Sequence, residues 1–184
     1  MIRAFWYDHL VCTMKVLYLY TIIAYILVQC RIFVGACCEN GWITFEESCY
    51  LFDEDHQLNW TEATQTCASY GGSHVVTIEN PDEFSFLQNH SKRLFKDATK
   101  RDNWFWLGAT DGEIEGIWVW YTDRTLLSNG YTNWYPGQPE TSDKNNQDCA
   151  CLWGHESYTW HDYHCDRKSF FICEQSLNEP SIIG

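Results

Sequence analysis

The chain is poor in basic residues. Its 184 residues include 12 Lys and Arg against 25 Asp and Glu, which gives a formal net charge of -13 at pH 7. Proteins bind the phosphates of nucleic acids through basic surfaces, so this balance argues against a nucleic acid as partner. The sequence also lacks a P-loop, a Gly-x-Ser-x-Gly motif and a His-Glu-x-x-His motif. We therefore expect that the protein is not an enzyme.

The chain also lacks the Cys-x-x-Cys pairs that are typical of zinc ribbons and fingers, although it contains ten cysteines. So many cysteines in a chain of this length indicate an oxidising compartment, where cysteines form disulfides. Aromatic residues make up 17% of the sequence and charged residues 20%, so there is enough apolar surface to drive folding. The composition predicts a folded, extracellular, disulfide-bonded protein.

Residues 1–36 are predicted to be a secretory signal peptide. An uncharged run, residues 16–30, follows Lys15, and small residues ending at Ala36 offer a cleavage site. Met14 is an alternative start. A membrane anchor is the alternative to a signal peptide, but the run is short for a hydrocarbon core of about 30 Å. The mature chain is then expected to be secreted, to carry no membrane span and to retain eight cysteines, an even number.

Residues 37–176 are predicted to form one domain, followed by a short tail, residues 177–184. No repeat, low-complexity stretch or linker divides the domain. Asn59 precedes Trp60-Thr61-Glu62 in a pattern that predicts a capped helix stopped by Gly71-Gly72, and Pro81 predicts the start of a second helix. Strand-like runs are expected at 74–78, within 104–120 and within 149–173.

The segment 121–148 between the aromatic runs is long, polar and rich in turn residues. A loop of this length in a compact domain is usually functional. Two triplets, beginning at Asn59 and at Asn89, match the N-glycosylation pattern, and secretion would allow their use. We therefore expect a glycoprotein whose binding residues lie on or near the long loop.

Several motifs occur in the order and spacing of a single family, from residue 38 to residue 174. They include Cys38–Trp42, Cys49-Tyr50, Trp106-Leu107-Gly108, Glu115–Trp120, Asn133-Trp134, Pro136–Glu140, Asp148-Cys149, Trp160-His161-Asp162 and Phe171–Glu174. With these motifs the chain resembles C-type lectin domains, and within them the perlucin-like lectins of molluscs.

The resemblance implies an α+β fold of two helices and two small antiparallel sheets, with a long loop that binds calcium and sugar. It also implies three disulfides, which are Cys38–Cys49, Cys67–Cys173 and Cys149–Cys165. Cys37 and Cys151 are left over. They can pair with each other, or one of them can link two chains into a disulfide-bonded dimer.

In the family, a calcium ion held by oxygen ligands completes its coordination with sugar hydroxyls. The resemblance carries this calcium- and carbohydrate-binding role to Gln138, Glu140, Gln147, His161 and Asp162, with Pro139 in the cis form. A second calcium position maps to Asp111, Glu115 and Asp148. The order Gln-Pro-Glu resembles the galactose-type Gln-Pro-Asp motif, so galactose-type glycans are the expected partners. Trp153 and Tyr158 are candidates to stack on a sugar, with core packing the alternative for Trp153.

Three departures from the family pattern affect the principal calcium site. Glu140 is one methylene longer than the usual Asp, Gln147 replaces an acid, and His161 replaces an Asn. Calcium prefers oxygen ligands, so an imidazole nitrogen and a missing charge both weaken such a site. We expect calcium binding to be weakened or lost. A zinc site on His155, His161 and His164 is a minor alternative, because imidazole suits zinc.

Two functions follow from this pattern. The first is a secreted, calcium-dependent carbohydrate-binding protein that prefers galactose-type glycans and serves glycan recognition in innate immunity. The second is a protein that keeps the lectin fold but has lost sugar binding, and acts as a protein-interaction or mineral-matrix component. The acidic surface and the departures at Gln147 and His161 favour the second; the remaining oxygen ligands favour the first.

Overall fold

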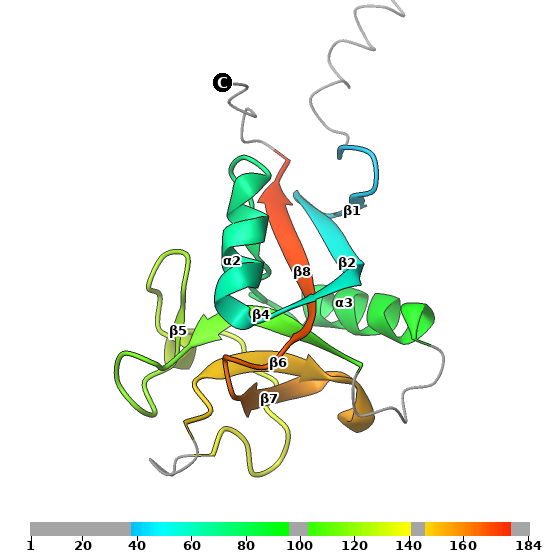
Figure 1. The fold of residues 1–184 in the computed structure, drawn as a ribbon. Helices are drawn as coiled ribbons and strands as arrows, with labels where there is room; N and C mark the ends of the chain where they lie inside the picture. The colour runs from blue at the N-terminus through cyan, green and yellow to red at the C-terminus, as the bar shows by residue number, and fades with distance from the viewer. Residues whose placement is uncertain (1–37, 96–102, 141–145, 178–184) are drawn as a thin grey trace, which may run out of the picture. The chain divides into compact units, whose positions relative to one another are not determined.

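The computed structural model describes residues 38–95, 103–140 and 146–177 (Figure 1). The expected signal peptide, Cys37 and nearly all of the expected tail lie outside these ranges. Within them, the elements in chain order are β1 (Ile43–Phe45), β2 (Ser48–Leu58), α2 (Trp60–Ser69), β3 (His74–Val75), α3 (Pro81–Leu94), β4 (Trp104–Thr110), β5 (Val119–Trp120), η1 (Leu127–Asn129), β6 (Cys149–Trp153), η2 (Gly154–Glu156), β7 (Thr159–Tyr163) and β8 (Ser169–Ser176).

The strands form two antiparallel groups that meet at β8. One group contains β1, β2, β3 and β8, and the other contains β4, β5, β6 and β7. A short parallel pairing of β4 with β8, at Phe105–Phe170 and Trp106–Phe171, joins the groups into one hydrogen-bonded path. In Figure 1, β8 runs from beside β2 towards β4, and the β6–β7 hairpin lies at the opposite end of the path from β1. The predicted α+β class is confirmed, with this parallel link as an addition.

Both predicted helices are present, and local sequence explains where they begin. Asn59 caps α2 in a capping box: its side chain accepts the N–H of Glu62 at 2.8 Å, and the Glu62 carboxylate accepts the N–H of Asn59 at 3.0 Å. Asn80 caps α3 through its side-chain oxygen, which accepts the N–H groups of Asp82 and Glu83, with Pro81 in the first turn. Within the described ranges, no helix has the length and apolar character needed to cross a membrane.

The expected strand at 74–78 is largely an irregular segment, since only His74–Val75 pair as β3. The reason is the position of Val76. Its N–H donates to the Ile172 carbonyl at 2.9 Å, while its carbonyl accepts the N–H of Gly108 at 2.9 Å. Val76 therefore connects β8 with β4 instead of continuing one ladder. A Cβ at Gly108 would lie 2.6 Å from the Val75 carbonyl oxygen, so this approach requires glycine.

Three disulfides hold the domain, and they are the pairs that the resemblance implies. Cys38–Cys49, Cys67–Cys173 and Cys149–Cys165 have Cα–Cα separations of 5.6, 5.3 and 5.3 Å. The bridge between Cys67 on α2 and Cys173 on β8 spans 106 residues. A loop of that size is expected to contribute roughly 4–5 kcal/mol through the entropy of the unfolded chain.

Cys151 is a free cysteine that lies completely buried on β6. Its register partners are Trp106 on β4 and His161 on β7, so both edges of β6 are paired around it. Burial and the nearby Asp162 raise the pKa of the Cys151 thiol well above its usual range. In the folded domain the Cys151 thiol is therefore not accessible to a second chain. A dimer link through Cys37, which lies outside the described residues, stays a prediction.

The core consists of two apolar clusters, and β4 contributes to both. All seven residues of β4 are buried. Phe105 and Leu107 pack in the cluster that contains Leu87 of α3, while Trp104 and Trp106 pack in the cluster around Cys67 of α2. Successive strand residues point to opposite faces, so the aromatic run of β4 serves both clusters. This buried strand is the support on which β6 and β7 are placed.

Candidate functional site

All five residues predicted for the principal site line one pocket of about 350 Å³. The pocket lies where the segment after Pro136 meets the β6–β7 hairpin. Its lining comprises Gln138, Glu140, Gln147, Trp153, His155, Glu156, His161, Asp162 and Tyr163. Residues from three separated parts of the sequence are therefore brought together here, as the resemblance implies.

Backbone hydrogen bonds attach the loop to β7. The N–H of Trp160 donates to the Asn133 carbonyl at 3.0 Å, and the N–H of Tyr135 donates to the Trp160 carbonyl at 2.9 Å. The N–H of Gln138 then donates to the Tyr135 carbonyl at 2.8 Å, which forms a turn. The peptide bond between Gln138 and Pro139 is cis, as expected. These bonds fix the Gln138 side chain beside the strand that carries Asp162.

Asp162 is the central carboxylate of the pocket and is 3% exposed. Its Oδ2 accepts the backbone N–H of Glu140 at 2.8 Å, which connects the loop directly to β7. Burial raises the pKa of Asp162 to about 6; the Glu140 N–H opposes this shift, while the charges of Glu140 and Asp111 add to it. The charged form of Asp162 is thus poorly compensated by its protein surroundings.

Two oxygens in the pocket are buried without a hydrogen-bond partner among the described residues: Oδ1 of Asp162 and Oε1 of Gln138. An unpaired buried acceptor is costly, so native proteins rarely leave one. Both belong to side chains that the sequence assigns to calcium, and carboxylate and amide oxygens are the ligands that calcium prefers. The oxygen atoms of the pocket are therefore suitable ligands for a hard cation such as calcium.

His161 lines the same pocket but faces a different environment from Asp162, because neighbouring strand residues point to opposite faces. Its ring stacks on Tyr135 with centroids 5.1 Å apart and lies 5.7 Å from the Trp153 ring. Its Nε2 is 3.5 Å from the Thr159 hydroxyl. Burial lowers the pKa of His161, which favours the neutral ring. His161 thus acts as an aromatic packing residue and supplies no oxygen ligand.

The zinc alternative is not supported. Across residues 38–95, 103–140 and 146–177, no three His, Cys, Asp or Glu side chains are arranged to hold a metal ion. The three histidines have separate contacts: His155 lies 3.4 Å from Glu156, and His164 Nδ1 lies 3.1 Å from the Asn146 carbonyl. This absence of His, Cys, Asp and Glu clusters does not exclude a calcium site, because amide oxygens such as that of Gln138 also serve as calcium ligands.

At the second predicted calcium position, Asp111 is 4% exposed and lies near Glu115 and Asp148. Asp111 Oδ2 accepts the N–H of Gly116 at 2.9 Å, while its Oδ1 is buried without a partner in the described part of the chain. Burial raises the pKa of Asp111, and the charges of Glu115 and Asp148 raise it further. The predicted acids are neighbours here, but they do not converge on a single point.

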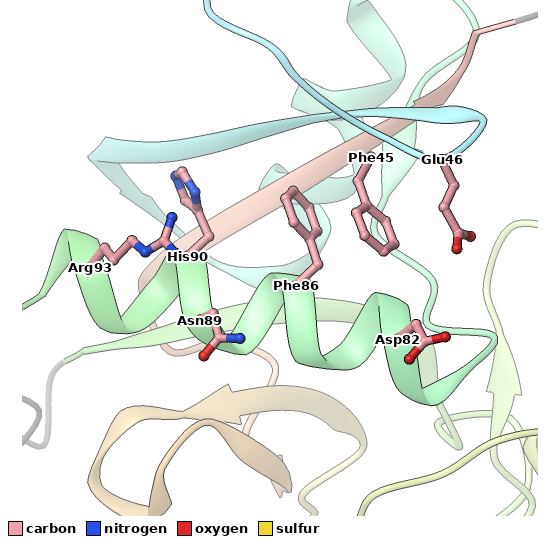
Figure 2. Close-up of a pocket in the computed structure, with 7 residues that line it drawn as sticks. All are labelled: Phe45, Glu46, Asp82, Phe86, Asn89, His90 and Arg93. Carbon is pink, nitrogen blue, oxygen red and sulfur yellow. The ribbon is translucent and has the colours of Figure 1, made fainter.

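A second pocket of about 500 Å³ lies along α3, where the β1–β2 turn approaches the helix (Figure 2). The rings of Phe45 and Phe86 stack there at 4.4 Å. Figure 2 shows Arg93 and His90 towards one end and Glu46 and Asp82 towards the other.

One predicted glycosylation residue, Asn89, is exposed and lines this second pocket. The other, Asn59, caps α2, with its side-chain oxygen bound to the N–H of Glu62. Neither pattern was confirmed or excluded by these positions, and both stay predictions.

The two aromatic candidates for sugar stacking differ. Tyr158 is fully buried in the core and does not line the pocket, so that expectation is wrong, whereas Trp153 is half-buried and lines the pocket. Sequence reasoning missed Glu156 and Tyr163, which also line it. Tyr163 lies two residues after His161 on β7 and therefore on the same face, a signal that strand periodicity offers.

Known proteins are similar to this chain over most of the described domain. Residues 56–175 match the family described as lectin C-type domain. The chain is 36% identical over 138 residues to perlucin of Haliotis laevigata, which covers 75% of this chain and 83% of that protein. It is 32% identical over 137 residues to a perlucin-like protein of Mytilus galloprovincialis, which covers 74% and 81%. Among solved structures, the mouse scavenger receptor C-type lectin carbohydrate-recognition domain has a TM-score of 0.62 at 30% identity, covering 76% of this chain and 96% of that one.

Proposed function

The chain belongs to the C-type lectin domain family, and on that premise we propose that its 350 Å³ pocket binds glycans with the help of calcium. The observation that carries this proposal is the pair of buried oxygens, Gln138 Oε1 and Asp162 Oδ1, that lack a partner among the described residues. They come from the loop and from β7, and they line the same pocket. The proposed role is binding and not catalysis.

The residues that would hold calcium are Gln138, Glu140, Gln147 and Asp162, each through an oxygen. A bound calcium ion would supply positive charge and coordination positions for a pair of sugar hydroxyls. The protein's own contribution is to hold these side chains in place. The hydrogen bond from the Glu140 N–H to Asp162 fixes the loop against β7, and the His161 stack on Tyr135 supports the loop from the other face.

We propose weaker calcium binding than in a set with three acids, because this set includes two carboxylates and two amides. Calcium affinity depends on the number of charged ligands. A preference for galactose-type glycans rests on the Gln138-Pro139-Glu140 motif. The three disulfides support an extracellular location. A role in glycan recognition during innate immunity is part of the same proposal. Glycosylation at Asn59 or Asn89 belongs to the same proposal.

The second candidate function is a lectin-fold protein without sugar binding, which would act through protein or mineral contacts. One observation favours it. His161 stands where the family usually has an oxygen ligand, and its ring is committed to a stack with Tyr135 and Trp153. In this case the acidic surface, and not the pocket, would be the functional part of the molecule.

Calorimetric titration of calcium into the protein, followed by retention on galactose- and mannose-coated resins with and without a chelator, separates the two functions. We expect calcium binding and chelator-sensitive retention on galactose resin. The Asp162→Asn variant should lose both, whereas the matched Asp166→Asn variant, at a side chain that is 86% exposed, should keep both. Absence of calcium binding together with unchanged retention would refute the calcium-dependent function. Retention on mannose alone would refute the galactose preference.

A further inference from the structure

The pocket extends beyond the residues assigned to calcium. Gln138, Glu140, Gln147 and Asp162 account for only part of its lining. The remainder comes from the β6–η2–β7 hairpin and consists of two aromatic rings, Trp153 and Tyr163, and two polar side chains, His155 and Glu156, besides His161. The proposed calcium ligands do not account for this part of the pocket, so it calls for a separate explanation.

The two aromatic rings form a supported wall. Trp153 and Tyr163 have centroids 5.2 Å apart. Both pack edge-on against Trp104 of β4, at 4.6 and 4.2 Å, and Trp104 is only 7% exposed. Because the buried Trp104 contacts both rings, their positions are fixed by the core. Each ring is only half-buried and therefore keeps accessible surface towards the pocket. A preformed wall binds a ligand without a large ordering cost.

The chemistry of this wall matches that of a sugar ring. A pyranose has an apolar face of C–H groups, which packs on aromatic rings, and a rim of hydroxyls, which need hydrogen-bond partners. Trp153 and Tyr163 offer the apolar surface. Glu156 offers acceptor oxygens and His155 a ring nitrogen, and both lie at the edge of the same pocket with side chains 35% and 45% exposed. An apolar lining with a few polar groups is typical of specific ligand sites.

We propose that the pocket binds an oligosaccharide of at least two residues, with its terminal sugar at the Gln138–Asp162 end and the next sugar on the Trp153–Tyr163 wall. This inference rests on the proposed glycan-binding function and adds the size class of the ligand. The terminal sugar uses the buried oxygens and the calcium they would hold. The second sugar packs on the wall and hydrogen-bonds with Glu156 and His155. The wall therefore selects the linkage that directs the second ring towards β6.

The test compares galactose with galactose-terminated disaccharides of different linkage, titrated calorimetrically into the protein in saturating calcium. We expect at least one linkage to bind about three- to tenfold more tightly than galactose, the range that an aromatic contact provides. Trp153→Leu should lower the affinity for that disaccharide more than the affinity for galactose, so that the preference for the disaccharide is lost. Tyr70→Leu, which alters an aromatic residue that is 42% exposed and lies outside the pocket lining, is the control and should change neither affinity.

The Glu156→Ala variant tests the same wall without disturbing the aromatic core, in case Trp153→Leu does not fold. It should lower the affinity for the disaccharide more than the affinity for galactose. Equal binding of galactose and every disaccharide, unchanged in both variants, would overturn the two-residue pocket and leave the proposed function standing. Failure of galactose, mannose and all disaccharides to bind in calcium would overturn the proposed function and the wall together.

Discussion

Buried carboxyl groups occur in two regions of this domain, and they are bonded very differently. Near β2 and β8, each oxygen of Glu83 and Glu174 accepts a hydrogen bond. Glu83 accepts from the Tyr50 hydroxyl at 2.7 Å and the Glu79 N–H at 2.8 Å. Glu174 accepts from Ser48 at 3.0 Å and from the N–H and hydroxyl of Thr77 at 3.1 and 3.0 Å.

In the pocket region, Asp162 and Asp111 are buried to a similar degree, but one oxygen of each lacks a partner among the described residues. Burial alone therefore does not mark a binding site in this protein. The distinguishing feature is incomplete bonding. A carboxyl whose oxygens are all bonded stabilises the fold, whereas one with an unpaired buried oxygen is available to a ligand that brings positive charge.

The largest loss of stability is expected when a carboxyl group with all its oxygens hydrogen-bonded is removed. Glu174→Ala removes three hydrogen bonds and leaves the buried N–H of Thr77 unsatisfied. We expect a loss of about 3 kcal/mol in the free energy of unfolding. Urea denaturation measures it, with Gln175→Ala on the same strand as control. A loss within 0.5 kcal/mol, about the usual effect of surface substitutions, would contradict a structural role for Glu174.

A pH effect of about 3 kcal/mol is expected from Glu83 in the same region. Burial raises the pKa of Glu83 to about 7, and the charge of Glu174 adds to this shift, while the Glu79 N–H and the Tyr50 hydroxyl oppose it. The folded protein then holds a proton that the unfolded chain releases near pH 4.5. The free energy of unfolding should therefore fall as pH rises from about 4.5 to about 7, and this contribution should be constant above pH 7.

Urea denaturation across this range checks the pH effect in the wild type and in Glu83→Gln. The variant loses one acceptor at the Glu79 N–H, so it should be less stable, but its slope with pH should be flatter than that of the wild type. Asp82→Asn, at an exposed position in the same helical turn, should keep the wild-type slope. Identical slopes in all three proteins would show that Glu83 titrates normally.

These contrasts also indicate what sequence could and could not predict. The starts of α2 and α3 follow from local patterns at Asn59 and Pro81, because a helix cap depends on residues three or four positions apart. The grouping of Gln138, Glu140 and Asp162 in one pocket came from motif resemblance. Local sequence could not show which oxygens are left unpaired, since that depends on how distant strands pack.

Non-local pairing explains what local sequence could not predict. Cys151 is buried because β4 and β7 pair on both sides of β6, a register that no local pattern encodes. The same register places His161 on the face with Trp153, so its ring packs with aromatic rings although it lines the same pocket as Asp162. The parallel contact of β4 with β8 likewise depends on residues far apart in the chain.

In the pocket region, removal of a buried carboxylate is expected to increase the free energy of unfolding, whereas the loss of Glu174 decreases it. In a chelator at pH 7, Asp162→Asn should raise the free energy of unfolding by about 1 kcal/mol, because it removes a buried charge and keeps an acceptor for the Glu140 N–H. Calcium should raise the thermal midpoint of the wild type and leave that of the variant unchanged. A variant less stable than the wild type in chelator would place Asp162 with the structural carboxyls and remove the contrast between the two regions.

The smallest effect is expected from adding charge to the pocket. Gln147 lines it together with Gln138, Glu140 and Asp162, so Gln147→Glu would bring a third carboxylate to the set. Calcium affinity, measured by calorimetry, should rise about threefold to tenfold, while stability in chelator should fall because like charges then face one another. Gln57→Glu adds the same charge at an exposed position of β2 and should leave calcium affinity unchanged. An equal gain in both variants would mean that overall charge, and not a ligand at residue 147, controls calcium binding. No gain in either would exclude residue 147 from the calcium ligands and leave Gln138, Glu140 and Asp162, of which Gln138 and Asp162 carry the buried oxygens without a partner among the described residues that distinguish the pocket from the region near β2 and β8.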